Sequence, residues 1–282
     1  MPLRAGNRRR IALIASAVAL GAAASAVPAL TAAAGAAVIP PSALPAVRYV
    51  ALGDSYSSGV GAGDYYGSDG SCERSRGAYP ALWAAASHPV SYVSEACSGA
   101  TIGSVLRSQL SALTKATTLV SITIGGNDVG FVPVMATCVL LPTSFCVSAV
   151  HTAEAEIQSA LPGELNQLLT AVSADAPDAR VVVMGYPEPY DLSRSASCVG
   201  LSGTDRTDLD QAASQLDTQL QAAAVRYGDA FADVRPAFAG HQICDSDSFL
   251  NSVDWLNIDA SYHPNAAGQA DAYYQVFRAA AS

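Results

Sequence analysis

The chain has 282 residues, of which 50% are hydrophobic and 14% are charged, and its formal net charge is −9. The length fits one large domain or two small ones, and the charged fraction is too high for a protein built from many membrane spans. Lys115 is the only lysine, so the chain offers no basic patch for a phosphate backbone, which argues against nucleic-acid binding. Glycine and proline do not recur at a fixed period, which excludes collagen-like and repeat architectures.

The first 46 residues have the pattern of an export signal. Arginines open the chain, at Arg4, Arg8, Arg9 and Arg10, and an alanine-rich apolar stretch follows at 11–24. Small residues at 24–26 and 35–37 provide cleavage sites, so we predict a signal peptide over residues 1–37 and a short Pro/Ala-rich leader over 38–46. The protein is then secreted to the extracellular space. An uncleaved membrane anchor stays an alternative, and the paired arginines leave Sec and twin-arginine export both open.

Predicted export changes how the cysteines are interpreted. There are six, an even number, which in an exported chain favours disulfides. The spacing favours pairing between neighbours in sequence, which gives Cys72–Cys97, Cys138–Cys146 and Cys198–Cys244. No Cys-x-x-Cys or Cys/His cluster is present, so a metal site is not expected.

From residue 47 onward, β-branched runs alternate with helical patterns. The predicted strands are 47–52, 90–94, 119–124, 180–185 and 230–234. The predicted helices are 79–87, 102–113, 149–173 with a break near 162–163, 206–227 and 266–280, and we expect loops at 128–149 and 186–205. This alternation predicts a parallel sheet covered by helices on both faces, in a single domain over residues 47–282. In such a sheet the functional site lies at the carboxyl ends of the strands.

Chemistry-bearing residues follow three of these strands and precede the last helix. Gly-Asp-Ser55-Tyr-Ser-Ser-Gly follows the first strand, where a serine on a tight turn projects its hydroxyl as a nucleophile does. Ser-Gly99-Ala-Thr and Gly-Gly-Asn127-Asp follow the second and third strands, and His263 stands in His-Pro-Asn before the last helix. Taken singly, these patterns also fit a helix N-cap, two turns and a surface histidine.

Together, and in this order, the four blocks resemble the SGNH (GDSL-type) hydrolase superfamily. The leader and the cysteine spacing resemble its secreted actinobacterial lipases and esterases. The resemblance implies an α/β/α sandwich with three layers and a five-stranded, flavodoxin-like parallel sheet. It also implies that Ser55 is the nucleophile, that His263 is the base, and that Gly99, Asn127 and the Ser55 N–H form the oxyanion hole. No metal or cofactor is implied.

One position departs from the family pattern. The usual acid lies three residues before the histidine, where this chain has Ala260. Asp259 lies one residue further away, so either Asp259 reaches the histidine through a local bulge or a main-chain oxygen near Ala260 or Ser261 orients the ring. We favour the main-chain oxygen, because a backbone carbonyl readily orients an imidazole.

The expected activity is hydrolysis of acyl esters through an acyl-enzyme, with lipids as the expected substrates. A carbohydrate O-acetyl esterase and a non-catalytic surface-binding protein on the same scaffold are the alternatives. The expected partner is a small-molecule or lipid ester, with at most transient contact with lipid aggregates, and the protein is expected to be a monomer.

Overall fold

In the computed structural model, residues 46–67, 70–194 and 198–282 are described. The predicted signal peptide and all but the last residue of the predicted leader lie outside these ranges. The architecture that follows is that of these described residues.

A five-stranded parallel sheet forms the centre of this part of the chain. Its strands are β1 (Arg48–Gly53), β2 (Ser91–Ser94), β3 (Leu119–Thr123), β4 (Arg180–Met184) and β5 (Ala230–Ala232), in the order β2-β1-β3-β4-β5. Each residue of β3 is buried, because helices cover both faces of the sheet. The five predicted strands are confirmed, with ends that differ by one or two residues.

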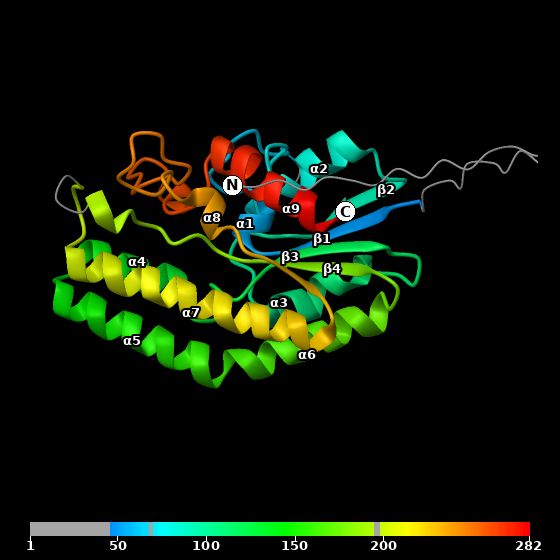
Figure 1. Ribbon diagram of the computed structural model, residues 1–282, viewed down its shortest axis with the longest axis horizontal. Helices are drawn as coiled ribbons and strands as arrows, with labels where there is room; N and C mark the ends of the chain where they lie inside the picture. Colours follow the sequence, from blue (N-terminus) through cyan, green and yellow to red (C-terminus); the bar gives the residue numbers. More distant parts are fainter. Residues whose placement is uncertain (1–45, 68–69, 195–197) are drawn as a thin grey trace, which may run out of the picture. The chain divides into compact units, whose positions relative to one another are not determined.

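Helices lie on both faces of the sheet (Figure 1). On one face are α2 (Tyr79–Ser87), α8 (Arg235–Phe238), the π-helical turn η6 (Gly268–Tyr273) and α9 (Tyr274–Ala280). On the other are α3 (Ile102–Ser104), α6 (Leu161–Asp175) and α7 (Gly203–Tyr227), while α5 (Thr143–Ser159) packs against α4 (Phe131–Leu140) and α7. The remaining elements are α1 (Ser55–Ser58), η1 (Gly70–Cys72), η2 (Val105–Gln109), η3 (Leu110–Ala112), η4 (Leu192–Arg194) and η5 (Ile258–Ala260). The fold is the predicted α/β/α sandwich.

The expectation of a loop at 128–149 is wrong. This segment forms α4 and the first turns of α5, joined by a tight turn at Leu141–Pro142. Phe131, Val134, Met135 and Cys138 are spaced at i, i+3, i+4 and i+7, so one side of α4 is apolar. Pro133 is tolerated because it lies in the first turn of the helix, where backbone N–H groups have no partner within the helix.

Four of the predicted helices differ in detail, among them 266–280, which contains the π-helical turn η6. The segment 102–113 is a short α-turn followed by π and 3₁₀ turns, and 149–173 divides at Ala160 into α5 and α6. The long helix α7 begins three residues early because Ser202 caps it: its hydroxyl accepts from the Asp205 N–H, and the Asp205 side chain accepts from the Ser202 N–H.

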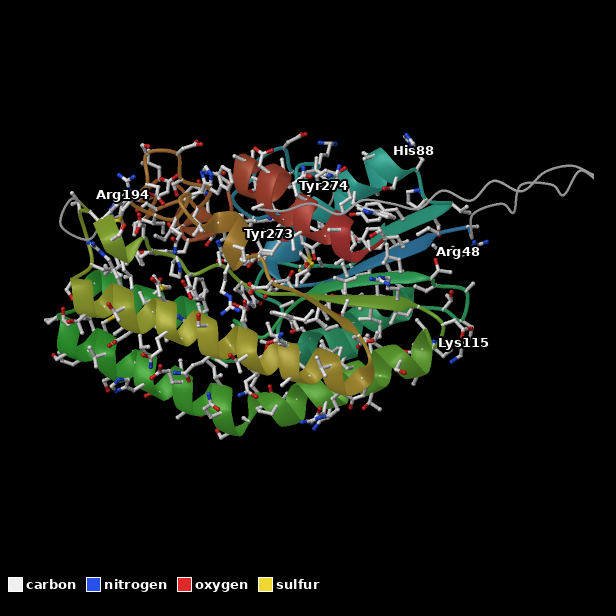
Figure 2. All side chains as sticks on the ribbon, viewed as in Figure 1. Arg48, His88, Lys115, Arg194, Tyr273 and Tyr274 are labelled. Carbon is white, nitrogen blue, oxygen red and sulfur yellow. A yellow bond between two sulfur atoms is a disulfide. The ribbon has the colours of Figure 1, made fainter. Side chains whose placement is uncertain are left out.

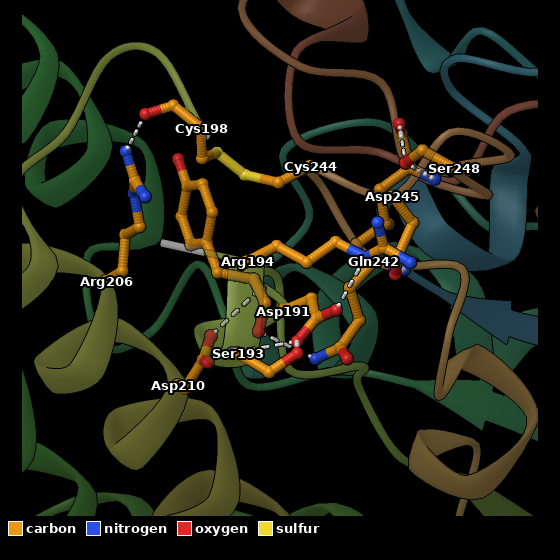
Figure 3. The surroundings of a disulfide bond; sticks show 12 residues. Asp191, Ser193, Arg194, Cys198, Arg206, Asp210, Gln242, Cys244, Asp245 and Ser248 are labelled. Carbon is orange, nitrogen blue, oxygen red and sulfur yellow. Dashed lines mark hydrogen bonds and ion pairs between the residues drawn. A yellow bond between two sulfur atoms is a disulfide. The ribbon is translucent and has the colours of Figure 1, made fainter. Parts of the chain in front are cut away.

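The three predicted disulfides are present, and the described residues contain no free cysteine. Cys138–Cys146 joins α4 to α5, and Cys72–Cys97 links the segment after α1 to the segment after β2. Cys198–Cys244 ties the segment before α7 to the loop that also holds Asp245, which pairs with Arg194 (Figure 3). Each bridge restricts the unfolded chain, and each fixes a segment at the end of the sheet that carries the motifs.

The turn after β1 requires glycine, and this requirement is testable. Gly53 has φ of 122°, and a Cβ atom there would lie 2.3 Å from the Thr123 carbonyl oxygen. Gly53→Ala is therefore expected to lower the free energy of unfolding by about 3 kcal/mol or more, measured by chemical denaturation. Gly163→Ala in α6 is the control, since no atom lies within 4 Å of its Cβ position, and it is expected to leave stability unchanged or raise it. Equal stability of the two variants would contradict the requirement.

Candidate active site

The end of β1 holds the sequence motifs together. The Asp54 N–H donates to the Thr123 carbonyl at the end of β3 (2.9 Å), and the Cys97 N–H donates to the Gly53 carbonyl (3.0 Å). The Gln109 side chain bonds both polar groups of Gly53, since Oε1 accepts from its N–H (2.7 Å) and Nε2 donates to its carbonyl (2.9 Å). The segments that carry Ser55, Gly99 and Asn127 are therefore fixed to one point.

Ser55 begins α1 directly after this turn. Asp54 caps the helix, because its Oδ1 accepts from the Tyr56 N–H (3.0 Å). The Ser55 Oγ lies 2.7 Å from the His263 Nε2, although 208 residues separate the two in sequence. The two side chains are only 7% and 8% exposed, so this hydrogen bond is largely shielded from water.

The orientation of His263 depends on the main chain. Its Nδ1 lies 3.0 Å from the Ser261 carbonyl oxygen, so an N–H at Nδ1 donates to that oxygen and leaves Nε2 to accept from Ser55. The residue between, Tyr262, has φ of 63°, and its carbonyl accepts from the Tyr56 hydroxyl (2.7 Å). The Asn251 N–H donates to the His263 carbonyl (2.9 Å). These bonds fix an unusual backbone shape that turns the Ser261 carbonyl toward the imidazole.

The other two residues considered for orienting the ring have different positions. The Asp259 side chain is exposed, while the Ala260 carbonyl accepts from the backbone N–H of His263 (3.3 Å). Burial lowers the pKa of His263 to about 4; the Ser261 carbonyl, the Asp259 backbone and then the Asp259 charge oppose this shift. The geometry thus places a carbonyl where the family pattern has a carboxylate.

Gly99 and Asn127 line the same cavity as Ser55 and His263. Gly99 has φ of 72°, and no atom lies within 4 Å of its Cβ position, so its backbone is open to an incoming group. One N–H of the Asn127 amide donates to the Ala100 carbonyl (3.0 Å), which fixes the side chain and leaves a second N–H. As the first residue of α1, Ser55 also has an N–H without a partner inside the helix. Ser55, Gly99 and Asn127 therefore line one cavity, which also contains His263.

Tyr186 is a site residue that the sequence analysis missed. Its hydroxyl donates to the Asp54 Oδ2 and accepts from the Gly126 N–H (3.3 Å), so it joins the serine turn to the Asn127 loop. Burial raises the pKa of Asp54 to about 7, and the bond from Tyr186 opposes that shift. A lone tyrosine after a strand has no motif, and its partner is 132 residues away, so the sequence carries no signal for it.

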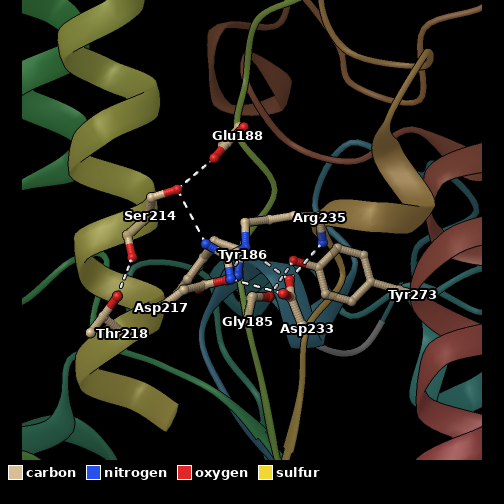
Figure 4. A network of polar contacts seen from close by, with 9 residues as sticks. All are labelled: Gly185, Tyr186, Glu188, Ser214, Asp217, Thr218, Asp233, Arg235 and Tyr273. Carbon is tan, nitrogen blue, oxygen red and sulfur yellow. Dashed lines mark hydrogen bonds and ion pairs between the residues drawn. The ribbon is translucent and has the colours of Figure 1, made fainter. Parts of the chain in front are cut away.

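A polar network holds Tyr186 in place (Figure 4). The Tyr186 N–H donates to the Asp217 Oδ1 (2.8 Å), and the Asp217 Oδ2 lies 3.4 Å from the Arg235 Nε. Arg235 also pairs with Asp233 (2.8 Å), and the Tyr273 hydroxyl donates to the Gly185 carbonyl (2.8 Å). Contacts from α7, α8 and η6 therefore fix the backbone from which the Tyr186 ring extends.

Two apolar cavities meet at Ser55. The larger, about 410 Å³, lies between α4 and the segment before His263, and Val139, Leu140, Val253, Trp255 and Ile258 are among its lining residues. The narrower, about 80 Å³, extends between α4, α5 and α7, where Val150, Ala153, Ile157, Ala213 and Leu216 line it. Asn127, Phe131, Met135 and Tyr262 line both. A group attached to the Ser55 oxygen therefore has apolar surface on two sides.

Within residues 46–67, 70–194 and 198–282, no three His, Cys, Asp or Glu side chains are grouped to hold a metal ion. No helix of these same ranges has the length and hydropathy needed to cross a bilayer.

A buried Ser–His pair at the carboxyl ends of a parallel sheet in an α/β/α sandwich defines a serine hydrolase. Residues 51–270 match the GDSL-like Lipase/Acylhydrolase family, and the chain belongs to it. The chain is a carboxylic-ester hydrolase, as its relatives of about 50% identity are lipases and a phospholipase.

Three relatives give the scale of the similarity. Lipase 1 of Streptomyces coelicolor is 52% identical over 253 residues, which cover 90% of this chain and 93% of the relative. The lipase of Streptomyces rimosus is 48% identical, over 83% and 87% of the two chains. The crystal structure of phospholipase A1 from Streptomyces albidoflavus NA297 has a TM-score of 0.82 and 50% identity, over 83% of this chain and 99% of that one.

Removing the Tyr186 hydroxyl tests the link between the two loops. Tyr186→Phe is expected to lower the free energy of unfolding by about 1–3 kcal/mol, because it leaves a buried carboxyl oxygen and an N–H without their partner. It is also expected to lower kcat/KM for a soluble ester about tenfold by loosening the oxyanion side of the site. Tyr227→Phe, which removes a more exposed hydroxyl that bonds the Asn166 carbonyl, is the control. If both variants keep full activity, Tyr186 does not position the site.

Proposed function

We propose that Ser55 and His263 catalyse ester hydrolysis through an acyl-enzyme. His263 Nε2 takes the proton of the Ser55 hydroxyl as its oxygen attacks the ester carbonyl, and the Ser261 carbonyl orients the resulting imidazolium. The N–H groups of Ser55 and Gly99 and the Asn127 amide stabilise the oxyanion. His263 then protonates the leaving alcohol, and water repeats the cycle to release the acid. The observation that carries this proposal is the 2.7 Å bond between Ser55 and His263 at the junction of two apolar cavities.

The proposed substrate is a lipid acyl ester. Both cavities are lined mainly by aliphatic and aromatic side chains, and burial of each methylene of an acyl chain contributes about 0.8 kcal/mol. We place the acyl chain in the narrower cavity and the alcohol part of the substrate toward the larger, more open one. The names of the relatives, lipases and a phospholipase A1, support the same class of substrate.

The setting of the reaction is also a proposal. The predicted signal peptide and the three disulfides support secretion, and the Streptomyces rimosus relative is an extracellular lipase. We propose that the mature protein acts as a monomer on its ester substrate, without a nucleic-acid partner and without a metal or cofactor.

A series of p-nitrophenyl esters from acetyl to palmitoyl tests the substrate class, with Ser55→Ala as the inactive blank. The expected kcat/KM rises with chain length beyond acetyl. Ala213→Phe, which fills the narrower cavity from α7, is expected to lower activity on long chains at least tenfold and to spare acetyl. Ala222→Phe on the exposed side of the same helix is the control. Activity on acetyl alone would favour a carbohydrate O-acetyl esterase, and no activity would favour a binding protein.

The low pKa of His263 predicts the pH dependence. The base must be neutral, so kcat/KM rises with pH through the pKa of the free enzyme, and its acidic limb is expected near pH 4 rather than near 6.5. Asp259→Asn removes only the weakest of the causes that raise this pKa, so most activity is expected to remain and the limb to move slightly downward. A loss approaching the ~10⁴-fold effect of neutralising a triad acid would make Asp259 a catalytic residue instead.

A further inference from the structure

Exposed apolar side chains surround the mouth of the larger cavity. They come from two segments, the α4–α5 hairpin and residues 255–258, which end at the first residue of η5. We call them the apolar rim: Val132, Leu140, Leu141, Phe145, Trp255, Leu256 and Ile258. Leu256 is 99% exposed and Trp255 is 68% exposed, so the described part of the chain leaves both side chains largely uncovered. Val132, Leu140, Trp255 and Ile258 also line the cavity, so the two segments face each other across it.

The rim is continuous with the site. The cavity that these side chains enclose ends at Ser55 and His263, so a molecule that contacts the rim lies at the entrance to the catalytic serine. Hydrocarbon would meet mainly apolar side chains along this path. A soluble sugar ester gains little from such a surface, whereas a molecule drawn out of a lipid aggregate remains in contact with apolar groups throughout.

The charge around the rim restricts the kind of lipid surface. From Val129 to Ala153 the chain has no Asp, Glu, Lys or Arg, and the loop that carries Trp255 adds only the carboxylates Asp254 and Asp259. Arg48, His88 and Lys115 lie at the amino ends of the strands, away from the hairpin (Figure 2). An anionic bilayer recruits proteins through basic clusters near its surface, and the two rim segments have none.

We propose that the apolar rim is a docking surface for uncharged or zwitterionic lipid aggregates, and that it places the cavity mouth against them. The proposal rests on the proposed lipid substrate, because only an aggregated substrate makes such a surface useful. Docking uses burial of the rim side chains and no basic patch. The side chains at its edge, Phe145 and Leu256, contribute to docking without lining either cavity.

Tryptophan fluorescence provides a direct measurement. The chain has two tryptophans, and Trp83 is buried at 7% exposure, so a change on binding reports Trp255. Phosphatidylcholine vesicles are added to the Ser55→Ala protein, which cannot hydrolyse them. A blue shift of the emission that saturates with lipid is expected, and 0.5 M salt is expected not to weaken it.

Matched substitutions test which surface docks. Phe145→Gln with Leu256→Gln is expected to lower the partition constant for phosphatidylcholine vesicles on the order of tenfold or more, and to leave hydrolysis of soluble p-nitrophenyl butyrate unchanged. The control is Val90→Gln with Val225→Gln, which changes two exposed valines outside the rim. It is expected to alter neither measurement.

Other outcomes would overturn the proposal. These are no shift, an equal loss in both double variants, or binding only to phosphatidylglycerol vesicles that salt abolishes. A blue shift that grows with protein concentration in the absence of lipid would instead make the rim an interface between copies of the chain. Failure of the proposed function would give a different result. The unsubstituted protein would then not cleave long-chain p-nitrophenyl esters, regardless of whether it binds phosphatidylcholine vesicles.

Discussion

The site depends on a close approach of backbones at the end of β1. Gly53 can turn there only because it has no Cβ, and the turn joins it to Cys97 while the next residue bonds Thr123 at the end of β3. Parallel strands bring their carboxyl ends to one edge, but they do not by themselves bring three loops within reach of one oxygen atom. The hydrogen bonds at Gly53, with the Gln109 amide on both of its polar groups, supply that last approach.

Burial sets the basicity of His263, and the Ser261 carbonyl sets the orientation of its ring. A shielded imidazole loses hydration when it is protonated, so its pKa falls, and a nearby carboxylate would oppose that fall more strongly than a neutral dipole does. The Ser261 carbonyl orients the ring and offsets only part of this fall in pKa. A weaker base remains neutral at lower pH but accepts the serine proton less readily. The arrangement therefore lowers the driving force for proton transfer and extends activity to lower pH.

Sequence alone was sufficient for the strands and for the groups that meet at the site. Most of the strands are short apolar runs with β-branched residues. Ser55, Gly99 and Asn127 stand in motifs that follow strands of the sheet, and His263 stands in a motif before the last helix. The α4 helix was missed because it begins beside a glycine-rich turn and has a proline in its first turn. The π turns were missed because a 3.6-residue period does not describe them. Tyr186 and Gln109 act on partners distant in sequence, so neither has a local pattern.

A main-chain oxygen as the orienting group also changes what mutation can do. A carboxylate is lost by one base change in its codon, but every amino acid at position 261 retains a carbonyl, so no substitution there deletes the acceptor itself. The vulnerability moves to residues whose side chains shape the backbone, such as Tyr262 with its left-handed φ and Asn251, whose side-chain Nδ2 donates to the His263 carbonyl (3.2 Å). Loss of function by mutation around this histidine would therefore arise from altered backbone geometry rather than from a missing charge.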